Sequence, residues 1–178
     1  MVRRARGCAR HGKKEAIAVV DLINPEEQVD LDFARARRRA RLGRLKTLLL
    51  KRGARRTLLS SEEVLRHTVL GGGSMYRGTR AVEVSRIVGS VGKHEQFDPD
   101  FMPLAKASPE KWKRIDRAYV LGQGLPPVSL LEVGEEYFVD DGNNRVSVAR
   151  FHGVEWIDAE VTEPASTHLL HVVHHTDA

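Results

Sequence analysis

The stretch that most constrains the fold is FVDDGNNRVSVARFHGVEWIDAEV, residues 138 to 161. It begins apolar, reaches two carboxylates and a glycine, continues with a helical pattern, and ends in an alternation typical of a strand. Gly142 permits an unusual backbone dihedral or a close approach, and Gly153 suits the left-handed position after a helix. The stretch therefore predicts a strand, a tight turn, a helix that begins at Asn143 or Asn144, and a last strand.

The turn between the first strand and the helix carries the residue types of a phosphate site. A helix N-terminus presents unpaired N–H groups and a partial positive charge, which favour an anion. Arg145 adds a forked donor suited to phosphate, and Asp140 or Asp141 would hold Mg²⁺ or orient a hydroxyl group. In the structural alternative, Asp141 and Asn143 only close the turn between strand and helix, and Arg145 pairs with Asp158 or Glu160.

The flanking sequence predicts the remaining elements of one domain. TRAVEVSRIVGS predicts a short strand and then a turn or short helix that ends near Gly89, and a loop follows. In SPEKWKRIDRAYV, Ser108 caps a helix whose inner face includes Trp112 and Tyr119. PPVSLLEVGEEYFVDD predicts a hairpin that turns at Gly134. This order of elements predicts an α+β domain with a small mixed sheet.

The charge is distributed unevenly along the 178 residues. Residues 1–56 contain 17 Lys and Arg against 6 Asp and Glu, whereas residues 57–178 contain 12 against 18. Residues 33–56 have 11 basic residues and no acid, which predicts a basic amphipathic helix. Such a helix binds nucleic acid, an anionic surface or an acidic protein, or it docks on the acidic part of its own chain.

Six arginines of this helix are expected to contact nucleic acid or a partner. They are Arg35, Arg37, Arg38, Arg39, Arg41 and Arg44. The leucines on one side of the helix are expected to pack, and they are Leu42, Leu45, Leu48 and Leu49.

The rest of the composition is that of an ordinary globular protein, with 41% apolar and 30% charged residues. No apolar run reaches the roughly 20 residues of a membrane span, and we expect a cytoplasmic protein. Cys8 is the single cysteine, which excludes an intramolecular disulfide and a cysteine zinc cluster. Near the C-terminus, His168, His171 and His175 share similar helical phases and either bind zinc or nickel or remain solvated.

The motif YFVDDGNNRVSVARFHGVEWIDAEVTE, preceded by GLPPVSLLEVG, resembles the signature of the ParB/sulfiredoxin superfamily, in which a strand ends in D-G-x-x-R and a helix follows. VEVSRIVGS resembles the first strand and helix of that fold, so the likeness covers about residues 79–163. The resemblance implies that the loop and helix start bind nucleotide phosphates. The superfamily includes CTP-dependent chromosome-partition proteins, ATP-dependent sulfinic acid reductases, ADP-dependent kinases of free serine and ParB-like nucleases.

Differences from those patterns narrow the activities that the resemblance implies. Sulfiredoxins resemble G-C-H-R at this place, and Asn143 replaces the nucleophilic cysteine, so sulfinic acid reduction is not expected. Partition proteins resemble G-E-R-R, whose carboxylate and second guanidinium the two asparagines lack. The free-serine kinases resemble D-G-x-x-R, which Asp141, Gly142 and Arg145 match, although asparagine replaces a histidine or threonine that is common there.

Local chemistry and resemblance together predict a nucleotide site for ATP, ADP or CTP, with Mg²⁺ as an accompanying ion. The predicted binding residues are Gly142, Asn143, Asn144, Arg145, Ser90 and Lys93. The predicted catalytic residues are Asp140, Asp141 and Glu83, with Asp141 also as the metal ligand. Ser90 and Lys93 come from GSVGKH, which lacks the spacing of a P-loop and is otherwise a glycine-rich surface turn.

We therefore predict a ParB-like protein that binds a nucleotide phosphate at the 141–145 loop and serves regulation, or acts with DNA or a partner. The alternatives are a Mg-dependent small-molecule kinase or nucleotide hydrolase and, less favoured, a ParB-type nuclease, so enzymatic turnover stays open. The predicted organisation is a basic, largely helical extension (residues 1–70), a flexible connector (71–78), the ParB/sulfiredoxin-like domain (79–163) and a histidine-containing tail (164–178).

Overall fold

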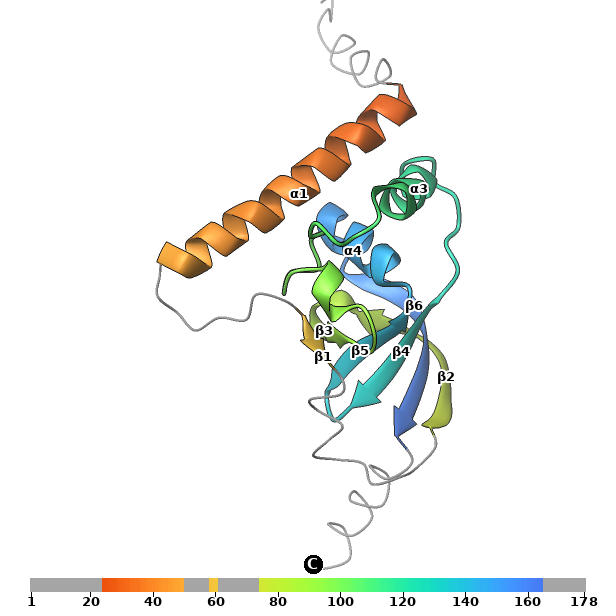
Figure 1. Ribbon diagram of the computed structural model, residues 1–178. Coiled ribbons are helices and arrows are strands. Elements are labelled where there is room, and N and C mark those ends of the chain that lie inside the picture. The colour runs from red at the N-terminus through yellow and green to blue at the C-terminus, as the bar shows by residue number, and fades with distance from the viewer. Residues whose placement is uncertain (1–23, 50–57, 61–73, 165–178) are drawn as a thin grey trace, which may run out of the picture.

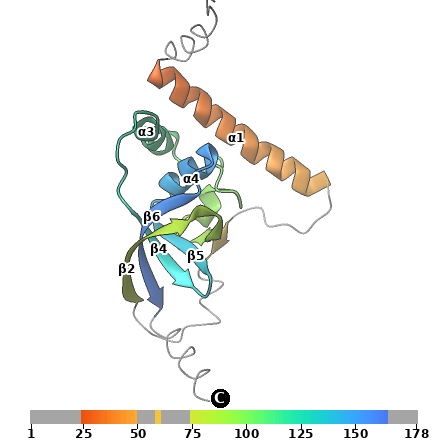
Figure 2. The ribbon, with the colours of Figure 1, turned by 180° about the vertical axis from the view of Figure 1, so that it is seen from behind.

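Three α-helices and a mixed sheet form the part of the protein that the computed structural model describes, residues 24–49, 58–60 and 74–164. The helices are α1 (Pro25–Leu49), α3 (Pro109–Val120) and α4 (Asn143–His152). Figure 1 shows α1 and α3 at one end of the molecule, the sheet towards the other end and α4 between them, and Figure 2 shows the same arrangement from behind. None of these helices combines the length and the apolar character that crossing a membrane requires.

The sheet has six strands in the order β1-β3-β5-β4-β6-β2. The strands are β1 (Leu59–Ser60), β2 (Ser74–Glu83), β3 (Ile87–Ser90), β4 (Val128–Val133), β5 (Glu136–Asp141) and β6 (Trp156–Pro164). β3 runs parallel to β5, and β4 runs parallel to β6, whereas β4 is antiparallel to β5 and β2 is antiparallel to β6. The mixed sheet with its separate helices confirms the predicted α+β class.

The hairpin that turns at Gly134, the helix after Gly142 and the last strand are present as predicted. β4 and β5 turn at Gly134, whose φ of 63° is a left-handed value that glycine adopts without steric cost. α4 begins at Asn143 and is followed by Gly153, with a φ of 72° and its N–H directed at carbonyl groups of the last turn. Val146 faces inward with no exposed surface.

Helix α3 is held on α4 by a buried hydrogen bond. Ser108 caps α3 as predicted, because its hydroxyl oxygen accepts from the Lys111 N–H. Trp112 has no exposed surface, and its indole N–H donates to Ser147 Oγ of α4 at 2.8 Å. Because a buried indole N–H needs an acceptor, this bond helps to set how α3 lies on α4.

Two sequence predictions about the sheet were wrong. Residues 74–78 of the predicted connector belong to β2, which pairs with β6 along its length. Most side chains of this edge strand are exposed, so its sequence lacks the apolar alternation of a strand with one buried face. Residues 87–90, predicted as a turn or short helix, form β3, and the 3-10 turn is confined to Val84–Arg86. Parallel pairing with β5 accounts for the difference.

Helix α1 docks on α3 and α4 through a different face from the one expected. Phe33, Ala36 and Ala40 are buried in a cluster that includes Trp112 and Phe151. Phe33 and Trp112 have ring centroids 5.4 Å apart. The contact lies in the middle of α1, and the small alanine side chains on this face let the helices approach closely.

The leucines of α1 lie outside that contact. Leu42 and Leu45 are 49% and 52% exposed, so the expectation that they pack was wrong, and the side chains of Leu48 and Leu49 lie outside the described residues. The sequence predicted that bases of α1 would meet acids elsewhere in the chain, but the ion pairs between α1 and α3 are the reverse. Acids of α1 pair with bases of α3, as in Asp30–Lys113 at 2.7 Å.

Several predictions concern residues outside the described part of the chain. They are the predictions on Cys8 and on the C-terminal histidines.

Candidate functional site

The turn before α4 requires glycine for two reasons. Gly142 has a φ of 103°, which L side chains rarely adopt. A Cβ at this position would lie 2.7 Å from Val128 Cγ1 and 2.8 Å from Arg145 Nε, closer than real contacts allow. The backbone of the turn is therefore pressed between β4 and the Arg145 side chain.

Arg145 lies over this turn and is held at two points. Its Nη2 donates to Asp141 Oδ2 at 2.7 Å, and its Nη1 donates to the Pro126 carbonyl oxygen at 3.2 Å. The Arg145 side chain is 12% exposed and that of Asp141 is 70% exposed. In the described residues the ion pair of Arg145 is thus formed with Asp141, and not with Asp158 or Glu160 as the structural alternative expected.

The two asparagines at the start of α4 have unused hydrogen-bonding groups. Asn143 is 2% exposed, yet its Oδ1 and Nδ2 have no partner in the described part of the protein, and Asn144 Oδ1 is likewise buried without one. No side chain caps the helix at Gly142. Because buried polar groups nearly always have partners, the turn has hydrogen-bonding capacity for a ligand or ordered water.

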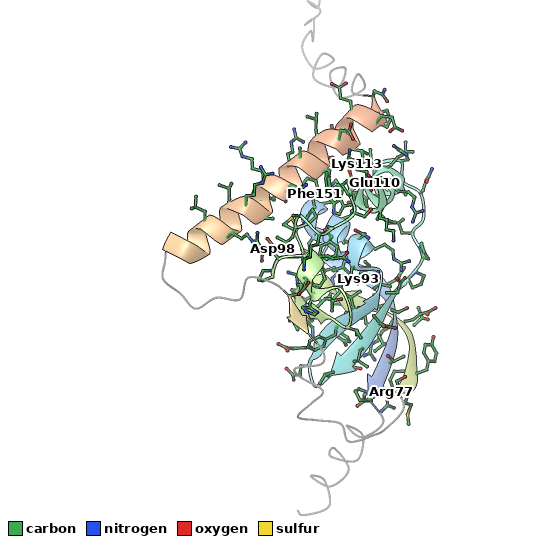
Figure 3. The ribbon with its side chains drawn as sticks, viewed as in Figure 1. Arg77, Lys93, Asp98, Glu110, Lys113 and Phe151 are labelled. Atoms are coloured by element: carbon green, nitrogen blue, oxygen red, sulfur yellow. The ribbon has the colours of Figure 1, made fainter. Side chains whose placement is uncertain are left out.

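The parallel pairing of β3 and β5 brings Ser90 and Lys93 to the same edge of the sheet as Asp140 and Asp141. Ser90 pairs with Val139, and its hydroxyl donates to the Val139 carbonyl oxygen at 3.3 Å. The same hydroxyl accepts from the Lys93 N–H at 3.1 Å. Ser90 therefore shapes the turn that carries Lys93, which is labelled in Figure 3.

Glu83 lies at the other end of α4. Glu83 of β2 pairs with Trp156, the first residue of β6. The row of paired residues that includes Asp141 of β5 crosses β4 and reaches Glu160 of β6. Four residues of strand separate these rows, a rise of about 13 Å. The structure therefore does not bring Glu83 together with Asp140 and Asp141.

The arginines of α1 fall into three groups. The guanidinium of Arg39 lies 4.6 Å from the Phe151 ring centroid and donates to the Phe151 carbonyl oxygen at 3.0 Å, so it helps to dock the helix. Arg35 and Arg37 contact side chains of α1 itself, Asp32 and Phe33. Within the described residues, Arg38, Arg41 and Arg44 are exposed and make no hydrogen bond or ring contact with the body of the protein, although Arg44 lies close enough to Asp98 to attract its charge.

Sequence reasoning did not assign a role to the segment before β4. A cavity of about 240 Å³ adjoins Arg145 and is lined by Gln123, Leu125, Pro126 and Trp156, among others. Two successive prolines in GLPPV were the available signal, because they favour an extended, rigid approach to the strand. The segment supplies both a wall of this cavity and the carbonyl group that holds Arg145.

Comparisons with known proteins give matches among solved structures. No protein-family model and no curated protein matches the sequence. The chain is similar to sulfiredoxin from Arabidopsis thaliana, with 14% identity and a TM-score of 0.39 over 53% of this chain and 96% of that chain. It is also similar to a Pnob8-like ParB-N domain, with 11% identity and a TM-score of 0.37 over 56% of this chain and 35% of that chain.

A third similar structure is the C-terminally truncated chromosome-partitioning protein ParB from Caulobacter crescentus, complexed with CTP-γ-S. It has 16% identity and a TM-score of 0.35 over 57% of this chain and 54% of that chain. At these identities the likeness concerns the fold alone, and it agrees with the ParB/sulfiredoxin-like fold predicted from the sequence.

Proposed function

We propose that the protein binds the phosphate groups of a nucleotide at the start of α4. The observation that carries this proposal is Asn143, a side chain 2% exposed whose donor and acceptor atoms both lack partners in the described residues. Leaving such a group unpaired costs about 1–3 kcal/mol. A nucleotide offers both kinds of partner, since phosphate oxygens accept hydrogen bonds and sugar hydroxyls donate them.

The charges around the turn favour a nucleotide accompanied by Mg²⁺. The positive end of α4, Arg145 and Lys93 attract phosphate. Asp140 and Asp141 are exposed beside them and would repel it. A divalent ion held by these carboxylates would remove the repulsion and bridge to phosphate oxygens. We therefore expect binding to depend on Mg²⁺.

The cavity beside Arg145 is a candidate place for another part of the nucleotide. Its volume of about 240 Å³ is smaller than the roughly 300–1,000 Å³ of pockets that enclose a whole drug-sized ligand. It is lined partly by the apolar side chains of Leu125 and Trp156, which suit a planar ring. The phosphates at the turn and a ring in this cavity would both contact Arg145.

The proposed role is regulatory, with α1 as the surface for a partner. Arg38, Arg41 and Arg44 are exposed on α1, and such a basic row attracts nucleic acid or an acidic protein. If the partner is nucleic acid, replacing these three arginines by alanine will weaken binding and reduce its salt dependence. Replacing the exposed Arg114 of α3 is the matched control.

Turnover of the nucleotide is the second candidate, and the exposed carboxylates of Asp140 and Asp141 favour it. A Mg-dependent kinase or hydrolase needs groups that hold the metal and orient a hydroxyl group or water. A kinase will consume ATP or ADP only when an acceptor is added, whereas a hydrolase needs none. A nuclease would instead cut DNA with a divalent metal and lose this activity in Asp141→Asn.

The test is a thermal-shift and calorimetry panel with ATP, ADP, CTP, GTP and inorganic phosphate, each with and without Mg²⁺. We expect one nucleotide to bind with Mg²⁺ and to bind at least about tenfold more weakly to Asn143→Leu and Arg145→Ala, the loss of roughly one charge-assisted bond. Arg114→Ala will bind as the wild type does.

The unliganded Asn143→Leu variant should melt no lower than the wild type, because it removes an unpaired buried amide. If the folded wild type binds none of these compounds, the turn is structural and the proposal is wrong. If Asn143→Leu binds as tightly as the wild type, Asn143 is not part of the site.

A further inference from the structure

A separate cluster of polar side chains lies where α1, α3 and α4 meet, at the opposite end of α4 from the phosphate site. Asp32 of α1, Asp116 of α3 and His152 of α4 each place one potential ligand atom within 4.8 Å of the other two. Asp32 is 3% exposed and Asp116 has no exposed surface. Figures 1 and 2 both show α3 and α4 beneath α1, and Phe151, the neighbour of His152, is labelled in this region in Figure 3.

The hydrogen bonds of the cluster leave one buried carboxylate oxygen without a donor. Asp32 accepts from Gln28 Nε2 at 2.7 Å and from Arg35 Nη1 at 3.0 Å. Asp116 Oδ1 lies 2.7 Å from His152 Nε2. Asp116 Oδ2 is buried and has no partner in the described part of the chain. Two carboxylates that lie so close together out of water are costly unless positive charge compensates them; Arg35 compensates Asp32, whereas Asp116 has only His152 beside it among the described residues.

We propose that Asp32, Asp116 and His152 bind one divalent transition-metal ion, for which Zn²⁺ is the best match. Imidazole nitrogen and carboxylate oxygen are both zinc ligands, with bonds of about 2.0–2.2 Å. Ligand atoms at those bond lengths lie about 3.3 Å apart in a tetrahedron. The ligand atoms lie within 4.8 Å of one another, with Asp116 Oδ1 2.7 Å from His152 Nε2, so side-chain adjustments would reach this geometry, and water would supply the fourth ligand.

Neighbouring side chains hold two of the three ligands in place. Gln28 and Arg35 orient the Asp32 carboxylate, and the Tyr119 ring stacks on His152 with centroids 4.3 Å apart and an interplanar angle of 24°. Such supporting contacts are typical of metal sites, because they fix the direction of each ligand.

The ion would connect three helices that are also joined by the Phe33 cluster, by the Trp112–Ser147 hydrogen bond, by Arg39 and by exposed ion pairs. Exposed ion pairs such as Asp30–Lys113 contribute at most about 1 kcal/mol. A metal bound to one residue from each helix would therefore fasten α1, with its exposed arginines, to the rest of the domain. Loss of the metal would loosen this attachment.

The test uses the full chain in a background in which His168, His171, His174 and His175 are replaced by alanine, because histidines near the C-terminus chelate metals adventitiously. After treatment with a chelator, Zn²⁺ binding is measured by calorimetry and elemental analysis, and Co²⁺ is added as a spectroscopic probe. The variants are Asp116→Asn and His152→Gln. The matched control is Glu136→Gln, an exposed carboxylate outside both the cluster and the phosphate site.

We expect one Zn²⁺ per chain in the background protein, visible Co²⁺ absorption, and a rise in melting temperature on adding Zn²⁺. Affinity should fall by more than about 100-fold in Asp116→Asn and His152→Gln, beyond the loss that a supporting residue causes, and should not change in Glu136→Gln. Equal Zn²⁺ affinity in Asp116→Asn and the background protein would overturn the proposal. So would the absence of stoichiometric Zn²⁺ and of Co²⁺ bands in the folded background protein, a result that does not depend on any variant folding.

Discussion

Replacing Gly142 by alanine tests how the turn before α4 is built. The added Cβ would be 2.7 Å from Val128 Cγ1 and 2.8 and 2.9 Å from Arg145 Nε and Nη2. The backbone φ of 103° adds a second, independent cost, because an L side chain is strained there whatever the free space. Either the turn must shift or Arg145 must leave its position over it.

The magnitude follows from these two costs. Strained backbone conformations cost about 1–3 kcal/mol each, and forcing an extra carbon into a close-packed site costs about 1–3 kcal/mol. We therefore expect Gly142→Ala to lower the free energy of unfolding by roughly 2–6 kcal/mol. The matched control is Gly153→Ala, which has a φ of 72° and no atom within 4 Å of the added Cβ. Its cost should be the backbone part alone, about 1–2 kcal/mol.

The assay is equilibrium unfolding in urea for the wild type and both variants, with the slope of the transition compared to confirm that the same surface is exposed. Gly142→Ala should also weaken nucleotide binding more than Gly153→Ala, because Arg145 is displaced. If the two variants lose the same stability, the close approach at Gly142 is relieved without cost, and the reasoning about this turn is wrong.

Three further predictions concern buried groups. Ser147→Ala should cost about 1–3 kcal/mol in urea unfolding, because it leaves the Trp112 indole N–H unpaired, and the added change Trp112→Phe should cost less in this variant than in the wild type. Phe33→Ala should cost about 3–5 kcal/mol and speed hydrogen exchange in α1, whereas Leu45→Ala, at a site 52% exposed, should change stability by less than about 0.5 kcal/mol. Burial raises the pKa of Asp98 above its usual 3.8, so the folded state binds the carboxyl proton of Asp98 more tightly than the unfolded state does. The free energy of unfolding therefore falls as the pH rises from 3.8 through the raised pKa. Asp98→Asn keeps an oxygen that accepts the same backbone N–H groups, so its stability relative to the wild type should be greater at pH 7 than at pH 4, and an equal difference at the two pH values would contradict this.

Short-range signals in the sequence were sufficient for most of the elements around the candidate phosphate site. Ser108 before a proline predicted the start of α3, Gly134 the hairpin, and Gly153 the end of α4, because each residue acts on the backbone within a few positions. The sequence also located the turn with Asp141 and Arg145, since its charged and glycine residues are adjacent along the chain.

Contacts between distant segments could not be predicted in the same way. The bond from Arg145 to the Pro126 carbonyl group, the burial of both polar atoms of Asn143, and the separation of Glu83 from the aspartates depend on how distant segments pack and pair. Residues 74–78 are a strand because β6 supplies hydrogen-bond partners to an otherwise polar, linker-like segment.

The sequence by itself thus determined the α+β class, the order of α3, the hairpin, α4 and β6, and the position of the loop before α4, because caps, turns and alternation act locally. Only the tertiary structure decided which face of α1 is buried, through Phe33 and the alanines that follow it, and which charged groups meet. Asp116 and His152 are 36 residues apart, and Asp32 lies on another helix, so no local pattern could associate them. They meet because apolar burial brings three helices together, and burial depends on the whole fold.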